Sequence, residues 1–422
     1  MVVCNHSVRL GNLCGVCGAE ISEEESLFCA LYTTCDVQIT HKHAVSAYRA
    51  RMKELKRTRK LILVLDLDQT ILHTVIHDAC SAPPQSGLES FVMDRCTYFV
   101  KLRPNLQDML EEISTIYEIH VYTMGTRAYA QRIVAIIDPK GLYFHDRIIT
   151  RDENQGMLVK SLGRMFPSKH KNIVILDDRA DVWDFCENLL LVRPFWYFNC
   201  VDINDPLRLR KKIQRETGLD VIECKRKRVD KIADNQVIEK LEEIALGITT
   251  SSALQTGEDK QDIAPEPSGY KRNENSRSLD DELLKITQIL KRIHKRYFSS
   301  MRGNVKKILR KYRKKVFDGK RIFVAETTNK QWLTKMIEMH GGIVGVSGNG
   351  LDCIVSQSRD DVEDLAKRFE CLVIQPGWIA ECVYSLKGVN YGKYIMCDYR
   401  VMDECENEIE RMFMTSKGGP VN

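Results

Sequence analysis

The pattern of apolar and polar positions is organised around one stretch near residue 65. Five apolar residues, at positions 61–65, run without a break and are followed at once by Asp66 and Asp68. An unbroken run of this length predicts a strand that is buried on both faces, as in a parallel α/β sheet. Asp66 and Asp68 should point to one side of the extended chain, and Thr70 adds a hydroxyl group. Two carboxylates and a hydroxyl at a strand end suit the binding of a hard cation and a phosphate. The alternative is that these residues only form a turn with Asx-type hydrogen bonds.

Two further apolar runs end in polar residues. Residues 119–123 predict a second strand that ends at Thr123, and residues 173–176 predict a third that leads into Asp177 and Asp178. Because the carboxyl ends of parallel strands meet at one edge of a sheet, we expect all three ends to converge. One strand could end in polar residues by chance, but it is much less plausible that three strands do so by chance. The same region predicts strands at 96–102 and 189–192, and helices at 106–117 and 127–137.

A second α/β pattern begins near residue 317 and carries no cluster of catalytic residue types. It predicts strands at 321–325, 343–346, 352–355 and 372–374, helices at 332–339 and 362–369, and a last helix with Pro376 in its first turn. Two helices precede it, with apolar stripes at 283–297 and 305–316. Fourteen Lys or Arg and a single acid lie between positions 289 and 321. This surface should attract anions, but few aromatic residues interleave the charges, so direct nucleic-acid binding is not expected.

The segment between the two patterns is strongly charged. Basic clusters at 208–212 and 225–228 suit a nuclear import signal or a phosphate-binding patch, or equally a solvated helix face. Residues 248–277 are rich in Ser, Thr, Gln, Glu, Pro and Gly, which predicts a flexible linker.

The length and composition of the chain limit the classes of protein to which it can belong. The 422 residues allow two or three domains, and 43% hydrophobic with 29% charged residues is typical of a soluble globular protein. No apolar stretch approaches the length of a membrane span, and residues 1–9 lack a signal-peptide pattern. We therefore expect no membrane association and a reducing compartment, in which the 15 cysteines are thiols or metal ligands.

The N-terminal residues contain a candidate zinc site. Cys14 and Cys17 form a Cys-x-x-Cys-Gly turn that is common in zinc knuckles, and Cys4 with His6 would complete four ligands. A redox Cys-x-x-Cys is less expected, because no strand-helix-strand pattern surrounds it. The alternative interpretation is that these cysteines are unliganded thiols and bind no zinc. Alternative ligands are Cys29, Cys35, His41 and His43.

Residues 60–192 resemble the catalytic domain of the RNA polymerase II carboxy-terminal-domain phosphatases, within the haloacid-dehalogenase-like superfamily. The matching motifs are LDLDQT at 65–70, KLRP at 101–104, YTMGTR at 122–127, RDE at 151–153, VKSL at 159–162 and LDDR at 176–179. Residues 317–396 resemble a BRCT domain, through Gly341, Gly342 and the Trp378 helix. A catalytic domain followed by one BRCT domain is similar to the large, transcription-associated members of that family.

The resemblance implies an α/β fold, with a haloacid-dehalogenase-like parallel sheet flanked by helices and a small α/β BRCT domain. The domain ranges that we expect are a Cys/His segment at 1–45, the phosphatase domain at 56–215, a basic helix and linker at 216–277, a basic helical connector at 278–316 and the BRCT domain at 317–405.

The resemblance also implies a mechanism, carried over residue by residue. Asp66 would be the nucleophile that forms an aspartyl-phosphate, and Asp68 would protonate the leaving serine oxygen and then activate water. Mg²⁺ would be held by the Asp66 carboxylate, the Asp68 main-chain carbonyl and Asp178, with Asp177 in support.

Five other positions complete the implied site. Lys160 and Thr123 would contact the phosphoryl group, and Thr70 would orient the first loop. Arg103 and Arg151 would support the site or bind the substrate.

The function implied is a Mg²⁺-dependent protein serine phosphatase acting in the nucleus on the phosphorylated heptad-repeat tail of RNA polymerase II, with general transcription factors as partners. Two alternatives stay open at this point. One is a small-metabolite phosphatase, and the other is a BRCT-containing transcription scaffold that is inactive or weakly active.

Overall fold

The computed structural model of the chain describes residues 4–21, 27–29, 37–76, 87–154, 159–167, 169–198, 280–325, 327, 329–345 and 350–399. They belong to two compact units, one ending at residue 306 and one beginning at residue 307 within the described part of the chain. The basic clusters at 208–212 and 225–228 and the predicted linker at 248–277 lie outside the described residues.

The first unit is built on a five-stranded sheet in which all neighbouring strands are parallel. The strand order is β10-β9-β5-β11-β12. β5 is central and every one of its residues is buried, which explains its unbroken apolar sequence. The predicted parallel α/β sheet is therefore confirmed. The strands are β5 (Leu61–Leu65), β9 (Tyr117–Tyr122), β10 (Ile148–Ile149), β11 (Ile173–Asp177) and β12 (Leu189–Leu191).

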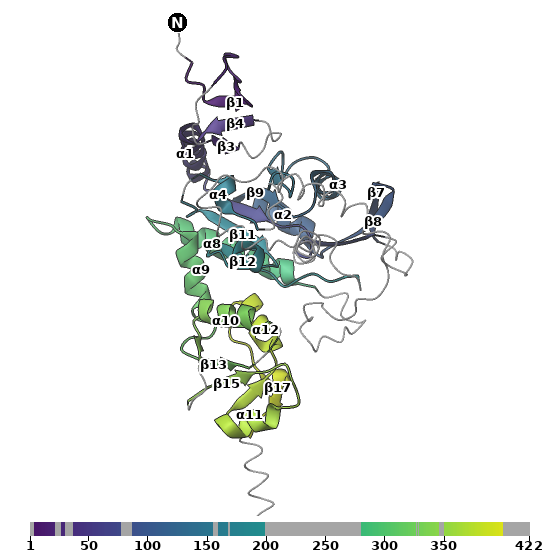
Figure 1. Cartoon of the computed structure of the whole chain (residues 1–422), viewed down its shortest axis with the longest axis vertical. Helices are drawn as coiled ribbons and strands as arrows, with labels where there is room; N and C mark the ends of the chain where they lie inside the picture. The colour runs from purple at the N-terminus through teal and green to yellow at the C-terminus, as the bar shows by residue number, and fades with distance from the viewer. Residues whose placement is uncertain are drawn as a thin grey trace, which may run out of the picture. The chain divides into compact units, whose positions relative to one another are not determined.

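Helices flank this sheet (Figure 1). In α2 the buried residues Leu106, Met109, Leu110 and Ile113 follow helical spacing. The prediction carried α2 on to residue 117, but Tyr117 pairs with Leu61 and begins β9, so strand pairing overrides the helical pattern. The helices are α1 (His41–Arg57), α2 (Leu106–Ser114), α3 (Arg127–Ile137), α4 (Leu162–Met165), the 3₁₀ helix η2 (Asp181–Trp183) and α8 (Glu282–Phe298).

α8 lies against α2 and belongs to the first unit. The hydroxyl of Tyr117 donates to the carbonyl of Leu290 at 2.8 Å, and the buried residues Leu283, Ile286 and Ile293 share one face of α8. The sequence predicted this apolar stripe but treated the helix as a connector. The predicted domain ranges themselves stay a prediction.

A small antiparallel sheet, of order β6-β8-β7, follows β5 directly in the chain. It consists of β6 (Leu72–Ile76), β7 (Glu89–Met93) and β8 (Cys96–Leu102). The strand expected at 96–102 is present, and its partners are β6 and β7 rather than strands of the parallel sheet. β6 begins two residues after Thr70, so this sheet fixes the far end of the acidic loop.

The N-terminal residues form a separate antiparallel sheet of order β2-β1-β4-β3 (Figure 1, purple). Its strands are β1 (Val8–Leu10), β2 (Leu13–Cys14), β3 (Leu27–Cys29) and β4 (Val37–Thr40). β4 leads without a break into α1, where the Thr40 hydroxyl caps the helix by accepting a hydrogen bond from the His43 amide at 3.4 Å.

The second unit contains a five-stranded sheet of order β14-β13-β15-β16-β17, parallel except for β17. Gly341 has φ +91°, and a Cβ atom there would lie 2.3 Å from the Lys314 carbonyl oxygen, so only glycine fits. Trp378 is buried and its indole N–H donates to the Val389 carbonyl at 2.8 Å. α9 (Val305–Arg313) begins two residues before the division between the units. The other elements are β13 (Arg321–Val324), α10 (Lys330–Met339), β14 (Ile343–Val344), β15 (Cys353–Val355), α11 (Val362–Phe369), β16 (Leu372–Ile374), α12 (Gly377–Ser385), the 3₁₀ helix η4 (Gly392–Tyr394) and β17 (Ile395–Cys397).

None of the helices in the described residues is long and apolar enough to cross a membrane.

Because His340 is buried, we expect the free energy of unfolding to depend on pH. Burial, with the nearby Arg313 charge adding to it, lowers the pKa of His340 from 6.5 to about 4. The unfolded chain therefore binds a proton that the folded chain does not, and stability is lost as the pH falls from 6.5 toward 4. The loss should reach as much as about 3 kcal/mol, measured as the free energy of unfolding in urea at neutral and acidic pH. His340→Gln should lose less stability over this range, and equal losses in the two proteins would contradict the assignment.

Candidate active site

Three carboxylates from two neighbouring strands meet at the carboxyl edge of the parallel sheet. β5 and β11 pair in register, with Leu65 opposite Leu176. Asp66 therefore follows β5 at the level where β11 ends in Asp177 and continues into Asp178. One oxygen from each of the three carboxylates lies within 4.8 Å of the others. The structure thus brings together the acids that the sequence predicted would converge.

Thr70 joins the two acids from separate strands. Its hydroxyl lies 3.2 Å from Asp66 Oδ2 and 3.2 Å from Asp178 Oδ1, and it accepts a hydrogen bond from the Asp178 amide at 3.1 Å. The chain returns to this position because Gln69 has φ +59°, in the left-handed region. This backbone conformation, which is uncommon for a residue other than glycine, shapes the loop around the carboxylates.

Lys160 is the cation of the cluster. Its Nζ atom lies 2.6 Å from Asp66 Oδ1 and 2.6 Å from Asp177 Oδ2, and its side chain is 2% exposed. Burial alone would lower the pKa of Lys160, but the carboxylates of Asp177 and Asp66 outweigh it and raise the pKa above the usual value. The ammonium group therefore stays charged beside Asp66.

Two aromatic residues, neither of which was predicted from the sequence, complete the surroundings of Lys160. Trp183 donates its indole N–H to Asp177 Oδ2 at 2.8 Å. Lys160 Nζ lies 5.7 Å from the centre of the Trp183 ring and 5.8 Å from that of Tyr122. Such contacts stabilise a buried cation further. The one signal in the sequence for the contact between Trp183 and Asp177 was the position of Trp183 shortly after the second acidic pair.

Asp68 lies outside the three-acid cluster, and its carboxylate has a different environment. Tyr129 donates to Asp68 Oδ1 at 2.5 Å, and its hydroxyl lies 2.8 Å from Thr74 Oγ1. A Cβ atom on Gly125 would lie 2.5 Å from the Tyr129 ring, so glycine is needed for the ring to reach Asp68. Tyr129 was missed in the sequence, although it lies in the first turn of α3, directly after the strand that ends at Thr123.

Thr123 follows β9, the strand beside β5, and is 1% exposed. Its hydroxyl accepts a hydrogen bond from the Gly125 amide at 3.0 Å. This contact holds the turn between β9 and α3, so Thr123 lies at the predicted edge of the sheet.

Arg103 lies beneath the acidic loop, with its side chain fully buried. Nη1 donates to the carbonyls of Thr70 and Arg193 at 2.9 and 2.8 Å, and Nε lies 3.1 Å from Asp280 Oδ2. These contacts favour a role in holding the loop backbone over a direct contact with substrate.

Arg151 differs from Arg103 in having no guanidinium hydrogen bond among the described residues. Its backbone amide donates to the Gly125 carbonyl at 3.0 Å, which places it behind the turn that follows Thr123. Burial lowers the pKa of Arg151, with the Asp152 charge acting against that effect. A largely buried cation with little compensation favours an anionic ligand.

The donor set fits a hard divalent cation. The carboxylates of Asp66, Asp177 and Asp178 carry three negative charges against the single charge of Lys160. Both Asp177 oxygens already accept hydrogen bonds, Oδ1 from the Arg179 amide at 2.8 Å and Oδ2 from Lys160. Asp66 Oδ2 and Asp178 Oδ1 instead share the single hydroxyl of Thr70, so these two carboxylates are better placed than Asp177 to hold the Mg²⁺ that the family resemblance implies.

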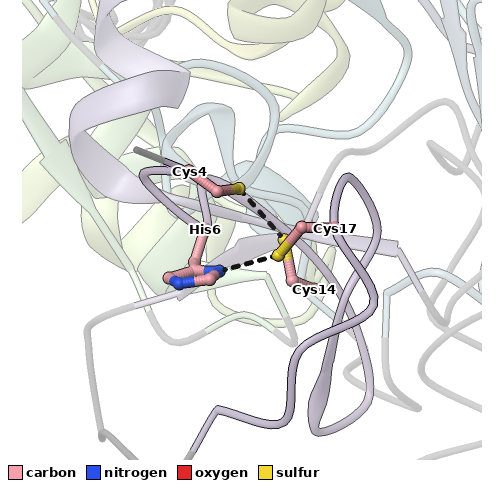
Figure 2. A group of neighbouring side chains, drawn as sticks. All are labelled: Cys4, His6, Cys14 and Cys17. Atoms are coloured by element: carbon pink, nitrogen blue, oxygen red, sulfur yellow. Dashed lines mark hydrogen bonds between the residues drawn. The ribbon is translucent and has the colours of Figure 1, made fainter. Parts of the chain in front are cut away.

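A second group of candidate metal ligands comes together in the N-terminal sheet. The ligand atoms of Cys4, His6, Cys14 and Cys17 all lie within 4.8 Å of one another, and their side chains point toward a common centre (Figure 2). The predicted alternatives His41 and His43 lie in α1 and are not part of this group. The side chains of Cys29 and Cys35 lie outside the described residues.

Comparison with known proteins gives one consistent family. The model of the NLI interacting factor-like phosphatases matches residues 61–215. A phosphatase of the RNA polymerase II C-terminal domain from Encephalitozoon cuniculi is 55% identical over 97% of this chain and 99% of its own length. The Saccharomyces cerevisiae protein of the same name is 28% identical over 95% of this chain and 66% of its own length. The solved structure of Fcp1, an essential RNA polymerase II CTD phosphatase, matches with a TM-score of 0.59 and 25% identity over 83% of this chain and all of that one.

The similarity is not confined to the catalytic sheet, because the Encephalitozoon protein aligns with nearly the whole chain. The predicted resemblance to the CTD phosphatases and the predicted enzyme class, a protein phosphatase, are both confirmed. The chain belongs to the RNA polymerase II carboxy-terminal-domain phosphatases and is a protein phosphatase.

Proposed function

We propose that the chain is a Mg²⁺-dependent protein serine phosphatase that dephosphorylates the heptad-repeat tail of RNA polymerase II through an aspartyl-phosphate. The observation that carries the proposal is the buried cluster in which Lys160 bridges Asp66 and Asp177 while Thr70 joins Asp66 to Asp178. The substrate is supported by the names of the relatives, which are RNA polymerase II C-terminal domain phosphatases.

Asp66 is the proposed nucleophile. An Asp66 oxygen forms a bond to phosphorus as the bond between phosphorus and the serine oxygen breaks, and the leaving oxygen takes a proton from Asp68. Lys160 offsets the repulsion between the Asp66 carboxylate and the dianionic phosphate, and it is already in contact with Asp66. A bound Mg²⁺, held by Asp66, Asp178 and the main-chain carbonyl of Asp68, would supply the remaining charge compensation.

Hydrolysis of the intermediate uses the same residues in the reverse direction. Asp68, now ionised, accepts a proton from water, whose oxygen attacks phosphorus and displaces the Asp66 carboxylate. Tyr129 and Thr74 orient the Asp68 carboxylate for both proton transfers. Thr123 and Arg151 are proposed to contact the phosphoryl group and substrate, whereas Arg103 acts indirectly, through the Thr70 backbone.

The second unit is proposed to be a BRCT domain, beginning near residue 317. Its support is the parallel sheet with one antiparallel edge strand, the Gly341 position that accepts no side chain, and the buried Trp378. Nuclear localisation and association with general transcription factors follow from the proposed substrate. The domain ranges given from the sequence are kept as part of this proposal.

Substrate choice separates this proposal from its two alternatives. Phosphate release should be fastest from a Ser-Pro heptad phosphopeptide, slow from sugar phosphates, and lost when EDTA removes divalent cations. It should return when Mg²⁺ is added. Preference for sugar phosphates would indicate a small-metabolite phosphatase, and no release from either substrate with Mg²⁺ present would indicate a scaffold.

Asp66→Asn should abolish turnover, because an amide is not a competent nucleophile. We expect kcat to fall by more than about 10³-fold, measured as phosphate release from the heptad phosphopeptide. Asp181→Asn is the matched control, since Asp181 is an exposed acid in the same region and pairs with Arg179. Near-normal turnover in Asp66→Asn would overturn the assignment of the nucleophile.

Arg151→Gln should weaken substrate binding more than it slows the chemical step. The charge of the buried Arg151 side chain is compensated only in part, so its loss should raise KM by about 10-fold with a smaller change in kcat. The measurement is steady-state kinetics with the phosphopeptide, and the control is Arg179→Gln, which removes an arginine already paired with Asp181. An unchanged KM would show that Arg151 holds a loop and does not bind substrate.

A further inference from the structure

Where burial is described in the N-terminal sheet, little of the apolar surface is buried. Its strands are two to four residues long. Among the first 40 residues whose burial is described, the only buried hydrophobic residue is Cys14. Leu10, Leu13 and Val16 are instead 49%, 51% and 69% exposed. A module of this size is normally held by a disulfide or a metal ion when apolar burial is insufficient.

Two separations between the candidate ligands match the edges of a zinc tetrahedron, and all four ligand atoms lie within 4.8 Å of one another. Cys4 Sγ lies 3.7 Å from Cys14 Sγ, and Cys17 Sγ lies 3.4 Å from His6 Nδ1 (Figure 2). Zn–S bonds of about 2.3 Å and a Zn–N bond of about 2.0 Å give tetrahedral S···S and S···N edges of about 3.8 and about 3.5 Å. The sulfur atoms are too far apart for a disulfide, which requires about 2.05 Å.

The backbone around the ligands is shaped for this arrangement. The Gly18 amide donates to the Cys14 carbonyl at 2.9 Å and closes the Cys-x-x-Cys turn, with Gly18 at φ +72°. The Val16 amide points at Cys14 Sγ at 3.4 Å, as suits a thiolate ligand. His6 has φ +46°, a conformation that costs about 1 kcal/mol or more outside glycine and that persists where the surroundings enforce it.

We propose that Cys4, His6, Cys14 and Cys17 bind one Zn²⁺ in a closed tetrahedral site, and that this ion is the core of the N-terminal sheet. Four protein ligands leave no open position, so the site is structural rather than catalytic. Its sulfur and imidazole donors also differ from the carboxylates around Asp66, so the two sites select different metals.

The site is joined to the catalytic unit through β4 and α1. The Thr40 amide donates to the Ser7 carbonyl at 3.0 Å, which ties the start of α1 to the loop that carries His6. α1 in turn packs on the catalytic unit, where Arg51 pairs with Glu118 of β9 and the Tyr48 ring lies 5.8 Å from that of Phe166. These α1 contacts do not involve the ligands, so zinc loss should unfold the N-terminal sheet and spare the active site.

The test is the metal content of the full chain, purified under reducing conditions without chelators. Elemental analysis should find about one zinc per chain. Cys17→Ser and His6→Ala should each lower the zinc content at least about five-fold, because a closed site loses most of its affinity with one ligand. Cys96→Ser is the matched control, a half-buried thiol in β8 that should leave zinc unchanged. Asp66→Asn should also keep its zinc, which separates this proposal from the proposed phosphatase mechanism.

X-ray absorption at the zinc edge of the wild-type chain provides a readout that does not depend on any variant folding. Three sulfur and one nitrogen ligand are expected. Oxygen-dominated coordination, a reduced wild-type chain that stays zinc-free after Zn²⁺ is added, or full zinc content in Cys17→Ser would each overturn the proposal.

Discussion

One shared ammonium group is the interaction on which the active site depends. Lys160 is buried and lies 2.6 Å from a carboxylate oxygen of both Asp66 and Asp177. Without it, acids from neighbouring strands would be packed together with little to offset their repulsion and their desolvation. With it, the Asp66 carboxylate lies beside a positive charge, and Asp178 is close enough to share a cation with Asp66. The same charge that stabilises the cluster therefore prepares it to receive a phosphate.

The loop that carries Asp66 and Asp68 is fixed from several sides, which keeps the two acids in different environments. Thr70 ties it to Asp178, and Arg103 holds the Thr70 carbonyl from below. Asp66 faces Lys160, whereas Asp68 accepts a hydrogen bond from Tyr129. The proposed division of labour between a nucleophile and a proton carrier rests on this difference.

The sequence predicted the sheet and the convergence of its acidic ends, because unbroken apolar strands and their terminal residues are local patterns. It did not reveal Tyr129 or Trp183, whose hydrogen bonds to Asp68 and Asp177 depend on how a helix start and a 3₁₀ turn pack against distant strands. Nor could it assign α8 to the first unit, since an amphipathic stripe shows that a helix packs but does not identify its partner. The N-terminal strands were not predicted because they are only two to four residues long, which is too short to show a repeating apolar pattern.

The most direct test of the account is to identify the atom that carries the phosphoryl group during turnover. The chain would be mixed with phosphopeptide and Mg²⁺, quenched in acid within one turnover, reduced with borohydride and mapped by mass spectrometry. An aspartyl-phosphate is reduced to homoserine, so the account predicts homoserine at position 66 and at no other aspartate. Modification at Asp68 or Asp178, or turnover with no covalent intermediate on the chain, would contradict it.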